Sequence, residues 1–296
     1  MSTMNVFNLI TLLFLTHDSI IESILNDVPI YDSPQVKIIS QYIHIFSKIS
    51  VNVKDVYMAS ATDFYKVDEY STNGCAFKSL QMLMSSLMLN NEYSEHLSKI
   101  WEHLYKMPLT RSQLPSMILL QNHLERCWDM GIDNSNVYRD RETRRVDGIY
   151  VRDVLTMLYG LRLNVNEVTF DDNQLKQEEL YQKLLNWLHQ YFKNLNDNKE
   201  NFVCPVLLFY QNDTSAHAAI VVGVEILLDD TIVPLVLSSD KIELNNLSLI
   251  NGMDLLNKVI RPYENDFKSC TVYQVLYING INNDENLNTI SVDYTP

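Results

Sequence analysis

Apolar residues recur at helical spacing through most of the first two thirds of the chain. The clearest case begins at Cys75, after which apolar residues return every three or four positions as far as Met88. The same spacing predicts further helices over 93–106, 114–130, 149–160 and 179–192. Pro115 is expected in the first turn of the helix over 114–130, where its missing N–H costs nothing.

The first 50 residues carry two apolar stripes and predict a helical or mixed N-terminal segment. The first stripe, over 20–25, follows Ser19 and Glu22, which fit a capping box. The second stripe runs over 36–43. Downstream, the alternation in VNVKDVYMAS predicts a strand over 51–60, and residues 61–74 are expected to form a loop.

The periodicity changes in the last third of the chain. Four runs rich in β-branched residues, with polar residues between them, predict strands over 204–210, 217–226, 231–239 and 270–278. An earlier strand is expected from Leu163 to Val168. Helices followed by strands are typical of the α+β class, in which an antiparallel sheet packs on helices.

Composition excludes several classes of function. The formal net charge of −14 over 296 residues argues against non-specific binding to nucleic acid or anionic membranes, which requires a basic surface. The apolar run NVFNLITLLFLTH lacks the basic start and the cleavage site of a signal peptide and is too short to span a bilayer. We therefore expect a protein of the cytoplasm or nucleus.

The four cysteines point to reduced thiols. Cys75, Cys127, Cys204 and Cys270 form no CxxC pair, so neither a zinc ribbon nor a redox dithiol is indicated. Without a phosphate-binding loop or a cluster of ligand residues, no metal, nucleotide or flavin is expected.

Cys75 and His217 are the candidates for nucleophilic chemistry. A free thiol has a pKa of about 8.5 and is a weak nucleophile at neutral pH, but the N–H groups and dipole at a helix start favour its thiolate. His217 opens an otherwise apolar strand, SAHAAIVVGVEI. Taken singly, each residue is more often structural. Together, a thiol at a helix start and a histidine on an antiparallel sheet are typical of papain-like peptidases.

Several segments resemble the ubiquitin-fold-modifier-specific proteases and their ubiquitin-cleaving relatives of the ZUFSP type. NGCAFKSLQ is similar to the family motif GWGCxYRxxQ around the nucleophile, with Asn73 in place of the tryptophan. LPSMILLQNHLERCWDMGID, DGIYVRDVLTMLYGLRLNV and PVLLFYQNDTSAHAAIVVGVEI resemble later family segments in the same order. The resemblance spans roughly 60–280 and implies a papain-like α+β fold.

The resemblance also implies roles for individual residues. It assigns Cys75 as the nucleophile, His217 as the base and Asp240 as the residue that orients the imidazole, although a gap-free alignment puts Ser239 there. The backbone N–H of Cys75 would form the oxyanion hole together with a side chain, for which Asn73 and Tyr70 are the candidates.

Three functions remain open from the sequence. The Asp-Pro-His cluster of the modifier-specific branch is absent from LVLSSDKIEL, which favours a peptidase that cleaves ubiquitin or polyubiquitin. The alternatives are a protease for the ubiquitin-fold modifier and a modifier-binding pseudo-protease. We expect the peptidase domain over 51–296, preceded by the segment 1–50, which binds a modifier or packs on its own domain.

Overall fold

The computed structural model describes much of the chain between residues 31 and 282. The described ranges are 31–32, 36–50, 52–66, 74–111, 113–133, 149–171, 176–197, 202–212, 215–239 and 269–282. The helices expected from the apolar spacing are present as α3 (Cys75–Leu87), α4 (Asn91–Tyr105), α5 (Met117–Asp129), α7 (Val151–Gly160) and α8 (Gln177–Asp197).

The late apolar runs form one antiparallel sheet, as the sequence predicts. Its strands are β3 (Val53–Met58), β6 (Leu163–Asp171), β7 (Val206–Gln211), β8 (Ala216–Leu227), β9 (Ile232–Ser238) and β10 (Val272–Ile281). Strand β8 is central, and β9 pairs along one of its edges. Along the other edge, β7 pairs with the first half of β8 and β3 with the second half. Beyond β7, the sheet continues with β10 and then β6. The α+β class is therefore confirmed.

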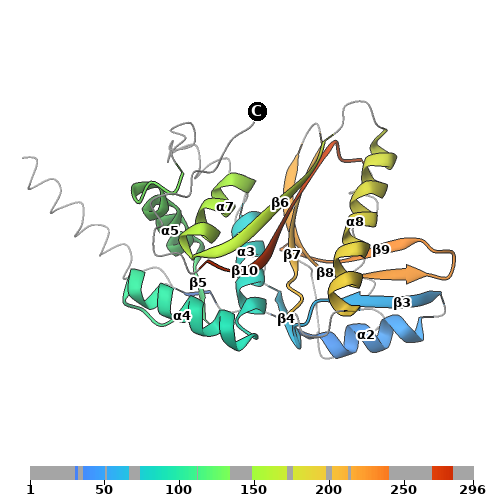
Figure 1. Cartoon of the computed structure of the whole chain (residues 1–296), viewed down its shortest axis with the longest axis horizontal. Helices are drawn as coiled ribbons and strands as arrows, with labels where there is room; N and C mark the ends of the chain where they lie inside the picture. Colours follow the sequence, from blue (N-terminus) through green and yellow to red (C-terminus); the bar gives the residue numbers. More distant parts are fainter. Residues whose placement is uncertain are drawn as a thin grey trace, which may run out of the picture.

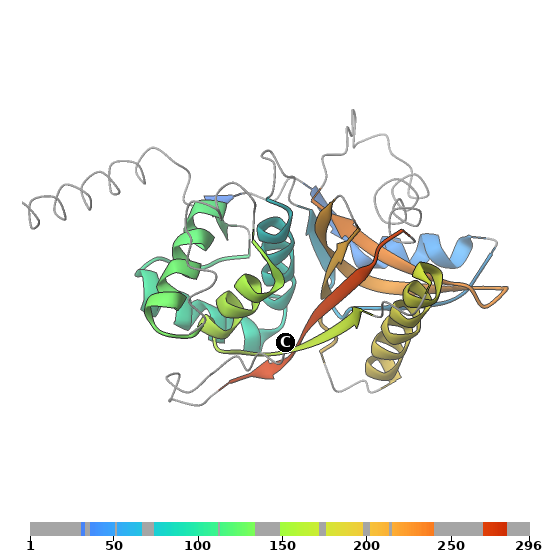
Figure 2. The same cartoon turned by 90° about the horizontal axis from the view of Figure 1, so that it is seen from above.

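Helices cover both faces of this sheet (Figure 1). Helix α3 packs against β7 and β8, whereas α8 lies against β3, β8 and β9. Seen from above, α3, α4, α5 and α7 gather on one side of the sheet and α8 lies on the other (Figure 2). Because both of its faces are covered, β8 is buried at every position from 218 to 226, which explains why Glu225 is the one charged residue in that run.

The second N-terminal stripe does not form a single helix. Its first half is strand β2 (Val36–Ile39), which pairs with β4 (Asp63–Lys66). Helix α2 (Ser40–Ile49) begins only after this strand. This strand followed by a helix fits the helical or mixed segment that was expected, whereas the predicted loop over 61–74 is wrong in part, because it contains β4.

The described part of the N-terminal segment packs on the sheet domain. Ser40 Oγ donates a hydrogen bond of 2.9 Å to the carbonyl of Thr62, just before β4. Helix α2 contacts β3 and β4, and the side chains of Ile38 and Ile43 are buried in the common core. The first apolar stripe lies outside the described residues. The domain boundary after residue 50 and modifier binding by this segment both stay predictions.

The start of the third predicted helix differs from expectation. Leu114–Pro115 form the short strand β5, which pairs with β1 (Tyr31–Asp32). Ser116 is the N-cap of α5, and its hydroxyl accepts a hydrogen bond of 3.2 Å from the N–H of Leu119. Pro115 therefore precedes the helix, because the serine side chain supplies the partner that a first-turn N–H requires.

A buried histidine joins α4, α5 and α7. Within His123, Nδ1 lies 2.6 Å from Tyr105 Oη, and Nε2 lies 3.0 Å from the carbonyl oxygen of Met157. Only Nε2–H can donate to that carbonyl, so Nδ1 accepts from the tyrosine hydroxyl. Burial lowers the pKa of His123 to about 4, which keeps the ring neutral.

This histidine predicts acid-sensitive stability. As the pH falls below about 6.5, His123 is protonated in the unfolded chain but resists protonation in the folded chain down to a pKa of about 4. Its contribution of about 3 kcal/mol is therefore complete above pH 6.5 and is lost as the pH falls toward 4. Urea unfolding at pH 7 and pH 4.5 should show a smaller loss of stability for His123→Gln than for the wild type. Equal losses would contradict the prediction.

Candidate active site

Cys75 is placed at the head of a buried helix. It is the first residue of α3, directly after the N-cap Gly74, and every following residue of the helix is buried. The first-turn N–H groups have no partner within the helix and favour a negative charge at this end. Among the four cysteines, all of which are described, Cys75 alone is half-buried and the other three are buried. It is therefore the thiol accessible to a substrate.

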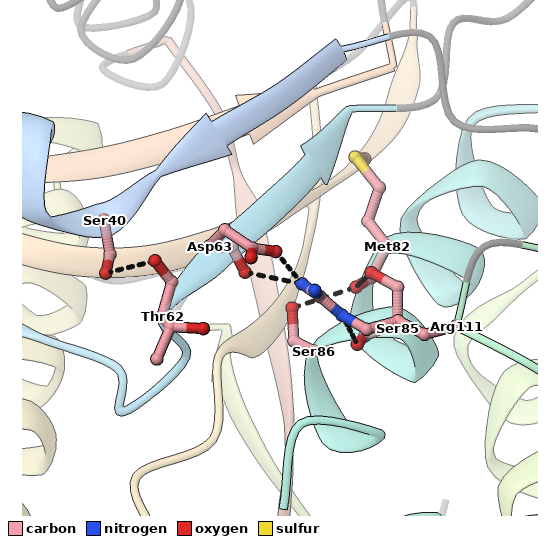
Figure 3. Close-up of polar contacts among 7 residues, drawn as sticks. All are labelled: Ser40, Thr62, Asp63, Met82, Ser85, Ser86 and Arg111. Atoms are coloured by element: carbon pink, nitrogen blue, oxygen red, sulfur yellow. Dashed lines mark hydrogen bonds and ion pairs between the residues drawn. The ribbon is translucent and has the colours of Figure 1, made fainter.

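Arg111 fixes helix α3 to strand β4. Its Nε donates to the carbonyl of Ser85 at 3.0 Å, and its guanidinium donates to the carbonyl of Asp63 at 3.0 Å (Figure 3). The same guanidinium forms an ion pair with the Asp63 carboxylate and lies 4.4 Å from the ring centroid of Tyr65. Arg111 could not be singled out from the sequence, because no motif marks it. Arg111 lies 48 residues after Asp63 in the sequence, and its contacts link β4 to α3.

A second contact anchors the same helix. Gln81, which matches the glutamine of the family motif, donates from Nε2 to the carbonyl of Pro115 at 2.5 Å. Gln81 lies within α3 and is fully buried. Helix α3, which carries the thiol, is therefore linked to β4 through Arg111 and to β5 through Gln81. Such support from the surrounding structure is what a reactive group requires to keep its geometry.

His217 lies near the start of β8, between two neighbouring strands. It pairs directly with Tyr210 of β7, and the two rings meet edge to face with centroids 5.4 Å apart. On the other edge, Nε2 of His217 lies 3.0 Å from Oγ of Ser238, the last residue of β9. The imidazole is thus held by side chains of both adjacent strands.

The elements that carry the two candidates are in contact. Helix α3, headed by Cys75, packs against β7 and β8, and β8 carries His217. A thiol at a helix N-terminus, packed on an antiparallel sheet that carries a histidine, is the arrangement that the sequence predicts.

Three other predicted site residues, Tyr70, Asn73 and Asp240, lie outside the described residues. Their proposed roles in the oxyanion hole and in orienting His217 therefore stay predictions. Ser239 is described and fully buried, immediately after β9. The serine hydroxyl within hydrogen-bond distance of His217 Nε2 is that of Ser238, which the sequence analysis missed. The sequence did show two adjacent serines, Ser238 and Ser239, at this place. The alignment alone did not fix which of the two faces the ring.

The described parts of the chain hold neither a metal site nor a membrane-spanning helix. No group of three or more His, Cys, Asp or Glu side chains there is arranged to hold a metal ion. None of the described helices has the length and apolarity needed to cross a bilayer.

The family model of peptidase family C78 matches residues 51–276. The chain belongs to peptidase family C78. The match spans both α3 with Cys75 and β8 with His217, and the papain-like α+β fold expected from the sequence is that of this C78 peptidase.

Curated relatives of this C78 chain are named as ubiquitin peptidases. The chain is 22% identical over 189 residues to zinc finger-containing ubiquitin peptidase 1 of Rattus norvegicus, a match that covers 61% of this chain and 30% of that protein. The protein of the same name from Homo sapiens is also 22% identical over 189 residues, with 61% of this chain and 29% of the relative covered. The chain thus matches less than a third of the length of these relatives.

Proposed function

We propose that this C78 peptidase is a cysteine isopeptidase that cleaves after the C-terminal glycine of ubiquitin. The observation that carries the proposal is the contact between α3, headed by the half-buried Cys75, and β8, which carries His217. Ubiquitin is chosen as the substrate because the curated relatives are named as ubiquitin peptidases. The missing Asp-Pro-His cluster favours the same choice over the ubiquitin-fold modifier.

In the proposed reaction His217 takes the thiol proton of Cys75, and the thiolate attacks the carbonyl carbon of the terminal glycine. The resulting oxyanion is stabilised by N–H groups at the head of α3. The imidazolium of His217 then gives its proton to the leaving lysine amine, so that an acyl-enzyme thioester remains. Water, deprotonated by His217, hydrolyses the thioester and restores the thiol.

The direct test uses ubiquitin with an electrophile in place of its C-terminal carboxylate. We expect the wild-type protein to form a covalent adduct at Cys75, visible as a mass increase of one ubiquitin, and Cys75→Ala to form none. The same electrophile on the ubiquitin-fold modifier serves as the parallel probe and should react much more slowly. Absence of any ubiquitin adduct with the wild type, or an adduct that persists in Cys75→Ala, would reject the proposal.

A ubiquitin-binding pseudo-protease is the second candidate. It is favoured by one observation: among the described residues, the group within hydrogen-bond distance of His217 Nε2 is the hydroxyl of Ser238. A hydroxyl stabilises an imidazolium much less than a carboxylate does. Ubiquitin binding without hydrolysis of any chain, with an affinity unchanged in His217→Ala, would select this alternative.

A further inference from the structure

We propose that Ser238 is the positioning residue for His217, and that it fixes the imidazole with Nδ1 as the base nitrogen. This inference rests on the proposed function, since it takes Cys75 and His217 as the reacting pair. It differs from the sequence-based assignment, which gave the orienting role to Asp240 or Ser239.

Strand register explains why Ser238 reaches the ring. Ser238 of β9 pairs directly with Ala219 of β8, and directly paired residues of antiparallel strands project from the same face. His217 is two residues before Ala219, so it projects from that face as well. Ser238 and His217 are therefore diagonal neighbours, and such a separation is within reach of a long or aromatic side chain. The 3.0 Å contact between His217 Nε2 and Ser238 Oγ follows from this pairing.

Burial makes this contact costly to lose. Ser238 is 1% exposed, so its hydroxyl has little access to water. A buried hydroxyl or ring nitrogen that loses its partner is not compensated by solvent. On the opposite edge, the Tyr210 ring lies against the imidazole at a centroid distance of 5.4 Å. The hydroxyl thus fixes one ring nitrogen while the tyrosine restricts the tilt of the ring.

The contact fits the tautomer that the proposed reaction requires, because a serine hydroxyl can accept a hydrogen bond as well as donate one. A neutral imidazole that accepts a proton at Nδ1 carries its own hydrogen on Nε2. That hydrogen is donated to Ser238 Oγ, and the same bond is retained when the ring becomes an imidazolium. An aspartate at this position would add an opposite charge and favour the imidazolium, whereas serine adds only a dipole. We therefore expect less thiolate at neutral pH than a carboxylate would give.

The test measures alkylation of Cys75 by iodoacetamide between pH 5 and pH 10 in the full chain, followed by peptide mass analysis. This readout needs no ubiquitin. Ser238→Ala should slow alkylation at pH 7 by about tenfold, and its rate should converge with the wild-type rate above about pH 9, where the thiolate forms without help. Ser238→Thr keeps the hydroxyl and should follow the wild-type profile. Ser238→Asp should extend the region of fast alkylation toward neutral pH.

The outcomes separate this inference from the proposed function. A dependence on Ser238 without any ubiquitin adduct would support the inference while rejecting ubiquitin as the substrate. Profiles of Ser238→Ala and Ser238→Asp that coincide with the wild type would overturn it. So would a profile altered by Asp240→Asn but by neither serine variant. A slowing that is equal at every pH, pH 10 included, would mean that Ser238 acts only on folding and would also overturn it.

Discussion

Replacing His217 by alanine is expected to lower hydrolysis of ubiquitin conjugates by about 10³-fold or more, because two proton transfers are lost together. Without the imidazole, Cys75 is left as an ordinary thiol at the head of α3, only partly ionised at neutral pH. The leaving lysine amine also loses its proton donor. Both steps depend on the same side chain, that of His217, which belongs to a strand that packs against the helix carrying the thiol.

The two losses can be measured separately. Alkylation of Cys75 by iodoacetamide needs a thiolate but no proton donor, so His217→Ala should slow it at pH 7 only about tenfold. Hydrolysis should fall far more, and raising the pH should restore alkylation without restoring hydrolysis. His103→Ala is the matched control, because His103 is an exposed histidine of α4 and should leave both rates unchanged.

The opposite pattern would remove His217 from the mechanism. If His217→Ala retains the wild-type rate of hydrolysis, another group takes the thiol proton. If alkylation and hydrolysis fall by the same small factor, the imidazole affects only the ionisation of Cys75 and not the leaving group. Circular dichroism and urea unfolding of the variant show whether the protein is still folded, which both comparisons require.

The sequence predicts the long, strongly periodic elements of this fold well. Helix α3 was recognisable because its buried faces repeat at helical spacing, and β8 because both of its faces are covered. The short pair β2 and β4 was missed, since each strand has four residues and its partner is distant in the sequence. The spacing from Val36 to Ile43 also fits a helix, and only the pairing with β4 decides for a strand.

The candidate site could be predicted only in part, for a related reason. Cys75 and His217 stand out by residue type and context, so the sequence alone singles them out as candidates. The position of Ser238 beside His217 depends on the register of β9 against β8. A shift of one residue would move the serine side chain to the other face of the sheet. An alignment of LVLSSDKIEL carries an uncertainty of one residue or more, which is enough to substitute Ser239 or Asp240 for Ser238.

The ion pair between Asp133 and Arg152 was invisible at the level of sequence, although both residues lie in segments that carry the family resemblance. Arg152 donates from Nε to Asp133 Oδ2 at 3.0 Å and from a terminal nitrogen to Oδ1 at 2.7 Å. Asp133 is fully buried and Arg152 is 7% exposed. Because the pair joins the chain after α5 to the first turn of α7, it holds these two helices at a fixed separation.

Asp133→Ala is therefore expected to destabilise the protein by about 3–5 kcal/mol, since it leaves the guanidinium of Arg152 buried without its carboxylate. Urea unfolding at pH 7 measures the effect. Glu95→Ala is the matched control: it removes the exposed i,i+4 pair of Glu95 with Lys99, whose side chains are 69% and 72% exposed, and should lower the free energy of unfolding far less.

A double variant distinguishes the effect of removing a countercharge from the effect of removing side-chain volume. Asp133→Leu together with Arg152→Met removes both charges and keeps apolar volume, so it should be more stable than Asp133→Leu alone by about 2 kcal/mol or more. Such a recovery would show that the single substitution destabilises the protein because the buried guanidinium of Arg152 loses the carboxylate of Asp133. If the double variant is instead the less stable of the two, the pair itself holds α5 and α7 together, and the penalty lies in the lost bidentate geometry.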